Sequence, residues 1–172
     1  MVVIALPPRR RGIRCAIRLR TAWKVSLGRE GVMVTRPVEV LANGVQRERA
    51  LVSDRPVLVV EDDPHIRTLL GDVLAEEGYL VVLAPDGATA LHYLFAHVRP
   101  GCVLLDLRLP VVSGITFRQV LQRDPELATV PAIVVSGDRP DARMRAALDA
   151  TAYVAKPFTV DEIVALVHTH HG

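Results

Sequence analysis

Five short apolar runs recur along the last two-thirds of the chain, and each is followed by a polar or loop-forming segment. They cover residues 56–61, 79–83, 101–106, 130–135 and 152–155. Their apolar residues are consecutive rather than alternate, which is typical of parallel strands buried on both faces of a sheet. The runs therefore predict five strands of a parallel sheet.

Amphipathic segments separate these runs. The first has apolar side chains at helical spacing, with Asp63 as its N-cap, Pro64 in its first turn and Gly78 at its end. The others are predicted near 86–97, from Ser113 to before Pro125, near 139–149, and from Thr159 onward. Alternating strands and helices predict an α/β fold with a five-stranded, doubly wound parallel sheet.

Composition divides the chain in two. Residues 1–55 carry 12 Lys and Arg against four Asp and Glu, a net charge of +8, whereas residues 56–172 carry a net charge of −6. We therefore expect residues 1–54 to be a basic N-terminal extension with little stable structure, apart from a short helix over Val38–Ala50, and residues 55–172 to be the folded domain. With 50% hydrophobic residues the chain can form a core, and no apolar stretch reaches the length of a membrane span.

Chemically useful side chains follow four of the predicted strands. Glu61 and Asp62 end the first, Asp106 the third and Ser136 the fourth, and Lys156 follows the fifth. The carboxyl ends of parallel strands meet at one edge of an open α/β sheet, where such proteins bind their ligands. Acids, a hydroxyl and an ammonium group there predict a pocket for a divalent cation and a phosphoryl group.

Five segments in this order resemble the receiver (response regulator) domain of two-component signalling: VLVVEDDPHIR, APDGATAL, LLDLRLPVVSG, IVVSGD and YVAKPF. The resemblance covers roughly Arg55 to Gly172 and implies a flavodoxin-like fold. It departs from the family at Val112, where Met is common, and at Asp149, in a turn that often contains Gly.

The resemblance also implies roles for individual residues. Asp106 would be the phosphoacceptor, and Mg²⁺ would be bound by Glu61, Asp62, Asp106 and the backbone carbonyl of Arg108. The ammonium group of Lys156 would pair with a phosphoryl oxygen. Ser136 and Tyr153 would form a switch that converts phosphorylation into a changed surface.

The function that follows is phosphorylation-dependent signalling in the cytoplasm by a stand-alone receiver. The expected phosphodonor is a sensor histidine kinase or a phosphotransfer protein. An unknown output protein, or a second copy of the chain, would bind at the fourth helix, fifth strand and fifth helix. We expect no enzymatic activity beyond self-phosphorylation from a phosphodonor and autodephosphorylation.

Three alternatives stay open. The basic N-terminal arm would give salt-sensitive nucleic-acid binding, although Trp23 alone accompanies its arginines, which disfavours stacking on single strands. The domain could dock without phosphorylation, which the intact acid site argues against. A phosphohydrolase using Asp106 as nucleophile would need a cap and a second catalytic acid that the pattern lacks.

Two finer hypotheses concern residues outside this acid pocket. Arg108 and Asp138 are expected to pair across its mouth and slow hydrolysis of the acyl phosphate. Residues 1–32 are suspected to be upstream sequence, because the codons of Glu30-Gly31 resemble a ribosome-binding site a few nucleotides before Met33.

Overall fold

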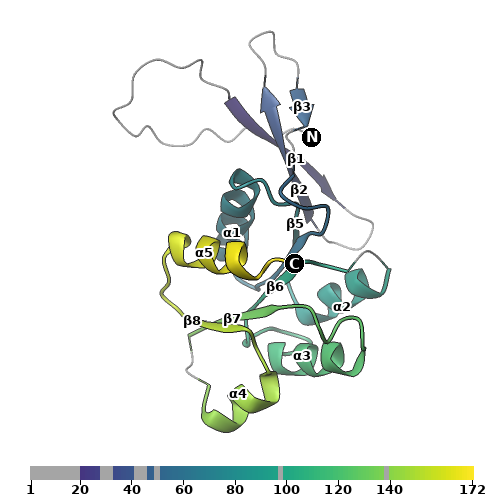
Figure 1. Cartoon of the computed structure of the whole chain (residues 1–172), viewed down its shortest axis with the longest axis vertical. Coiled ribbons are helices and arrows are strands. Elements are labelled where there is room, and N and C mark those ends of the chain that lie inside the picture. Colours follow the sequence, from purple (N-terminus) through teal and green to yellow (C-terminus); the bar gives the residue numbers. More distant parts are fainter. Residues whose placement is uncertain (1–19, 28–32, 41–45, 49–50, 97–98, 138–139) are drawn as a thin grey trace.

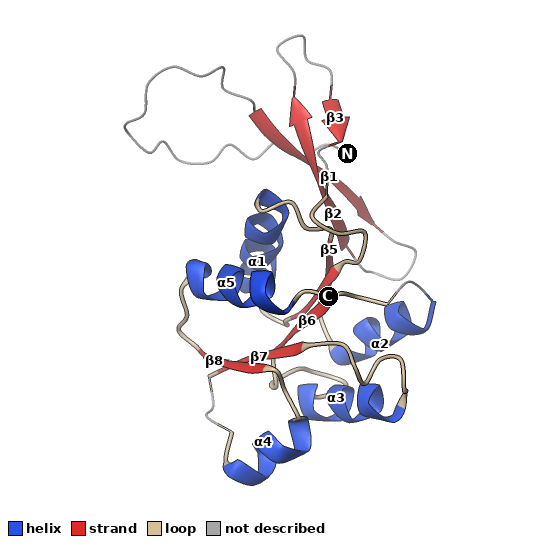
Figure 2. Ribbon diagram, viewed as in Figure 1, coloured by secondary structure: helices blue, strands red, loops and turns tan. Residues whose placement is uncertain are grey.

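The computed structural model describes residues 20–27, 33–40, 46–48, 51–96, 99–137 and 140–172. Its centre is a parallel sheet with helices on both faces (Figures 1 and 2). The parallel strands are β4 (Val57–Val60), β5 (Val81–Ala84), β6 (Cys102–Leu105), β7 (Ala132–Ser136) and β8 (Ala152–Ala155). They lie side by side in the order β5-β4-β6-β7-β8, so the expected doubly wound sheet is confirmed.

In the described part of the chain, five helices alternate with these strands: α1 (Pro64–Glu76), α2 (Gly87–Ala96), α3 (Gly114–Arg123), α4 (Ala142–Leu148) and α5 (Val160–His170). Asp63 caps α1 as expected, because its Oδ1 accepts hydrogen bonds from the backbone N–H of His65 (2.8 Å) and Ile66 (3.1 Å). None of the helices described is long and apolar enough to cross a membrane.

Consecutive residues of each parallel strand enter two different cores, as strands covered on both faces should. Val57 and Val59 pack with α1 and α5, which lie on one side of the sheet. Leu58 and Val60 pack with α2 and α3 on the other side, where Phe117 is fully buried. A smaller cluster joins α4 to β7 and leaves α4 near the β8 edge of the sheet.

The N-terminal region forms strands where we expected little structure. β2 (Met33–Val40) lies antiparallel to β5, with Met33 opposite Leu83, and it also pairs with β1 (Arg20–Leu27) and β3 (Gln46–Glu48). The short helix expected over 38–50 is wrong, because β2 continues to Val40 and β3 is extended. The edge of β5 offers unpaired backbone groups, and a β-prone segment satisfies them by adding a strand. The arginine run at 9–11 lies outside the described residues.

Candidate functional site

The expected side chains meet at the carboxyl edge of the sheet. Asp106 directly follows β6, Glu61 and Asp62 follow β4, and Lys156 follows β8. They line one open pocket, whose walls are Glu61, Asp62, Asp63, Ile66, Asp106, Arg108, Gly137 and Lys156. Parallel strands in register bring Glu61, Asp106 and Lys156, which are 45 to 95 positions apart in the sequence, into this one place.

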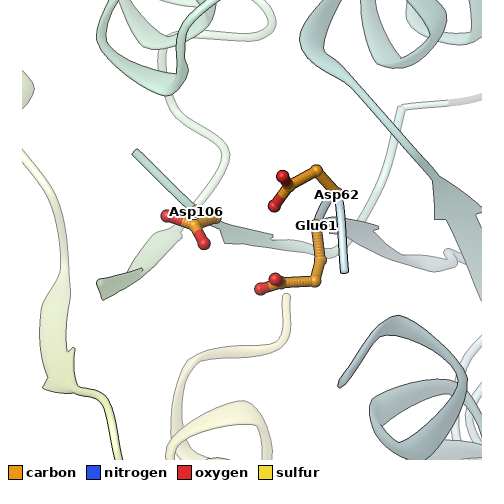
Figure 3. Close-up of side chains that lie close together, drawn as sticks. All are labelled: Glu61, Asp62 and Asp106. Atoms are coloured by element: carbon orange, nitrogen blue, oxygen red, sulfur yellow. The ribbon is translucent and has the colours of Figure 1, made fainter. Parts of the chain in front are cut away.

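Three carboxylates converge inside the pocket. One oxygen atom from each of Glu61, Asp62 and Asp106 lies within 4.8 Å of the others (Figure 3). Glu61 is only 2% exposed and Asp106 only 6%, whereas Asp62 faces solvent. Buried carboxylates so close together need a cation, and hard oxygen ligands with one side open to water suit Mg²⁺. The donor set therefore fits the metal that the sequence predicted.

The ammonium group of Lys156 joins two of these acids. Its Nζ donates to Glu61 Oε1 at 2.9 Å and Oε2 at 2.7 Å, and to Asp106 Oδ2 at 2.5 Å. Burial raises the pKa of Glu61 above its ordinary value, although Lys156 opposes the shift. Burial also acts against the charge on Lys156, but hydrogen bonds to Asp106 and Glu61 outweigh it and raise the pKa of the ammonium group. Lys156 therefore stays protonated between the two buried acids.

The loop after Asp106 holds the carboxylate in place. The backbone N–H of Arg108 donates to Asp106 Oδ1 at 2.8 Å. Gly114 packs directly against this strand end, since a Cβ atom there would lie 2.1 Å from the carbonyl oxygen of Asp106. Arg108 lines the pocket as expected. Asp138, its expected partner across the mouth, lies outside the described residues.

The two expected switch residues occupy different environments. Ser136 is buried at the end of β7, and its carbonyl oxygen accepts a hydrogen bond from the backbone N–H of Lys156. Tyr153 in β8 contacts α4 instead: its hydroxyl donates to the carbonyl oxygen of Arg145 at 3.1 Å, and the Arg145 guanidinium lies 4.7 Å from the ring centre. Tyr153 therefore belongs to the surface formed by α4 and β8.

Sequence reasoning missed Arg67, which holds the main chain of the acidic loop. Arg67 Nη1 donates to the carbonyl oxygens of Glu61 (2.7 Å) and Asp62 (3.0 Å). A signal was present, because Arg67 lies one helical turn after Asp63 and so can reach back over the loop. A basic residue in the first turn of a helix is common, however, and the sequence pattern did not single out Arg67.

Comparisons with known proteins show which family the chain is similar to. The family model for the response regulator receiver domain matches residues 57–168. The chain is 36% identical over 135 residues to the sensor histidine kinase TmoS of Ectopseudomonas mendocina, a match that covers 76% of this chain and 14% of that protein. It is 37% identical over 119 residues to the alkaline phosphatase synthesis transcriptional regulatory protein SphR of Synechococcus elongatus, covering 63% of this chain and 46% of SphR. The chain thus spans less than half the length of either relative.

A solved structure shows the same architecture. The receiver domain of a sensor histidine kinase from Pseudomonas aeruginosa, which has a magnesium ion coordinated in its active-site cleft, superposes with a TM-score of 0.61 at 27% identity. The superposition covers 70% of this chain and 99% of that domain. The fold agrees with that domain and the family model covers most of the chain, so the chain belongs to the response regulator receiver domain family of two-component signal transduction.

Proposed function

We propose that Asp106 accepts a phosphoryl group from a histidine kinase or a phosphotransfer protein. The observation that carries the proposal is the convergence of three carboxylate oxygens within 4.8 Å, with Lys156 bound to Asp106. A carboxylate can attack phosphorus to form an acyl phosphate. As the new oxygen–phosphorus bond forms, the phosphorus–nitrogen bond of the phosphohistidine breaks, and the nitrogen keeps the electron pair and takes up a proton.

In this proposal the neighbouring residues neutralise the arriving charge. Mg²⁺, when bound by Glu61, Asp62, Asp106 and the Arg108 carbonyl, would supply positive charge beside the phosphoryl oxygens. Lys156 already touches Asp106 Oδ2 and would pair with a phosphoryl oxygen. The Arg108 N–H, bound to the other carboxylate oxygen, keeps Asp106 oriented.

The output is proposed to be a changed protein-binding surface. Ser136 would donate its hydroxyl to the phosphoryl group, and Tyr153 would leave its hydrogen bond to Arg145 on α4. The surface of α4, β8 and α5 would then favour an output protein or a second copy of the chain. TmoS and SphR are a kinase and a transcriptional regulator by name, so the kind of output differs even among relatives of this domain.

Acetyl phosphate labelling tests the proposal. The wild-type protein is expected to take up acid-labile phosphate when Mg²⁺ is present, and Asp106→Asn is expected to take up none while keeping its far-UV circular dichroism spectrum. Asp161→Asn makes the same chemical change at an exposed position on α5 and serves as the control. Labelling of Asp106→Asn at the wild-type rate and stoichiometry would show that the phosphoacceptor is another residue.

A further inference from the structure

We propose that Arg67 is a positioning residue that holds the acidic loop between β4 and α1 in its metal-binding shape. Arg67 Nη1 donates to two successive carbonyl oxygens, those of Glu61 (2.7 Å) and Asp62 (3.0 Å). The inference rests on the proposed function, because it assigns Arg67 an effect on the Mg²⁺ site. It concerns a residue outside the set of acids, hydroxyl and lysine described above.

The acidic loop depends on a side-chain donor because it lies between β4 and α1, outside the hydrogen-bonding pattern of either element. The Glu61 N–H still bonds to the carbonyl oxygen of Ala84 on the neighbouring strand (3.2 Å), and Asp63 already caps α1. The carbonyl oxygens of Glu61 and Asp62 come after β4 ends and before α1 begins, so neither the sheet nor the helix ladder pairs them. The half-buried Arg67 supplies their donors from the first turn of the helix.

Arg67 itself is fixed at the same place. Its backbone N–H donates to the carbonyl oxygen of Asp63 at 2.9 Å, and its side chain reaches back to the two residues before Asp63. The main chain and the side chain of Arg67 thus together bind all three residues of the acidic loop, Glu61 to Asp63. A shift of the loop would have to break charge-assisted hydrogen bonds.

The choice of acceptor matters for metal binding. Lys156 binds carboxylate oxygens of Glu61 and Asp106, so it occupies atoms that a cation would also use. Both hydrogen bonds from Arg67 go to main-chain oxygens. Its charge therefore reduces the repulsion within the acidic loop without occupying a carboxylate oxygen. Replacing a residue that orients metal ligands without contacting the metal typically lowers metal affinity by about 10-fold to 100-fold.

Mg²⁺ titration of the full chain by isothermal calorimetry tests the inference. Arg67→Met removes the donors and keeps an apolar stem, and it is expected to raise the Mg²⁺ dissociation constant by about 10-fold or more. Arg67→Lys restores a charged donor and is expected to fall between Arg67→Met and wild type. Arg123→Met, at an exposed position on α3, removes the same charge and is expected to stay within about twofold of wild type, because its charge is screened at that distance.

A second measurement needs no metal. In the metal-free protein, backbone amide hydrogen exchange of Asp62 and Asp63 is expected to be faster in Arg67→Met than in wild type, while amides of the β6 strand keep their protection. Faster exchange everywhere would point to general destabilisation and would overturn the positioning role.

The outcomes separate this inference from the proposed function. If wild type binds Mg²⁺ and Arg67→Met binds it equally well, the role of Arg67 is refuted and the proposed function stands. If wild type binds no Mg²⁺, the proposed metal site itself fails. Should Arg67→Met not fold, Arg67→Lys decides: an unchanged dissociation constant refutes the role, and one raised about threefold or more supports it.

Discussion

Replacing Arg118 by Met tests how the structure holds α4 in place. Arg118 lies on α3, is only 3% exposed, and donates from Nε to the carbonyl oxygen of Leu148 and from Nη2 to that of Asp149, each at 2.9 Å. These acceptors are at the C-terminal end of α4, where carbonyl groups lack partners within the helix. Gln122, also on α3, donates to the carbonyl oxygens of Ala147 (3.1 Å) and Leu148 (3.2 Å). α3 therefore clamps the end of α4.

The expected cost combines two opposing effects. A hydrogen bond to a charged group contributes about 1.5–3 kcal/mol, and Arg118→Met removes two of them, although Gln122 still serves Leu148. Against this, burial lowers the pKa of Arg118, and its Nη1 is buried without a hydrogen-bond partner, so the guanidinium is incompletely solvated in the folded protein. We expect a net loss of about 2 kcal/mol in the free energy of unfolding.

Urea denaturation and thermal denaturation, each followed by circular dichroism, measure this loss. For a chain of 172 residues, about 2 kcal/mol corresponds to a decrease in Tm of about 4–8 °C. Gln122→Ala should cost less, about 1 kcal/mol, because Gln122 is half-buried and neutral. Arg143→Met, an exposed change on α4, should stay within about 0.5 kcal/mol of wild type. An Arg118→Met protein as stable as wild type would show that desolvation of the guanidinium group cancels the gain from its hydrogen bonds. The stabilising role of Arg118 at the end of α4 would then be refuted.

Three further predictions concern the loop after Asp106, the acid pocket and the N-terminal strand. Val111 has φ 63° and is 85% exposed, so Val111→Gly should relieve left-handed backbone strain of about 1–2 kcal/mol. Glycine costs about 0.5–1 kcal/mol in backbone entropy, so Tm should rise slightly, and a lower Tm would contradict this. Burial raises the pKa of the Glu61 carboxyl group, so the folded metal-free protein keeps the carboxyl proton to a higher pH than the unfolded chain does. The free energy of unfolding should therefore fall as pH rises above 4.5. The urea concentration at the unfolding midpoint, measured at several pH values, should change less with pH in Glu61→Gln than in the wild type. If the midpoint falls as steeply in the variant, Glu61 is not the cause of the fall. Deleting residues 1–32 removes β1 but keeps Met33–Thr35 paired with β5, so phosphorylation should be unchanged and Tm should fall less than after deletion of residues 1–36. Equal Tm values for the two deletions would rule out a stabilising role for the pairing of Met33–Thr35 with β5.

The sequence by itself determined the parallel sheet and the composition of its active edge. Runs such as Val57–Val60 and Cys102–Leu105 are apolar at every position, and a strand of that kind is stable only when both faces are covered. Once the strands are parallel, the residues that follow them must share an edge. The meeting of Glu61, Asp106 and Lys156 follows from that topology, and for this reason it could be predicted.

Tertiary structure alone decided which partners these groups and edges take. Arg118 contacts Leu148 across 30 residues, and Gln122 contacts the same carbonyl group across 26, so no local pattern specifies either pair. The N-terminal strand is a similar case: we expected little structure at Met33–Thr35, and in the folded protein the open edge of β5 supplies its hydrogen-bonding partners. The pattern of apolar residues shows which face of a segment is buried, because that pattern lies within the segment itself. Hydrogen-bond partners depend on how completed elements pack, and that information exists only in the folded molecule.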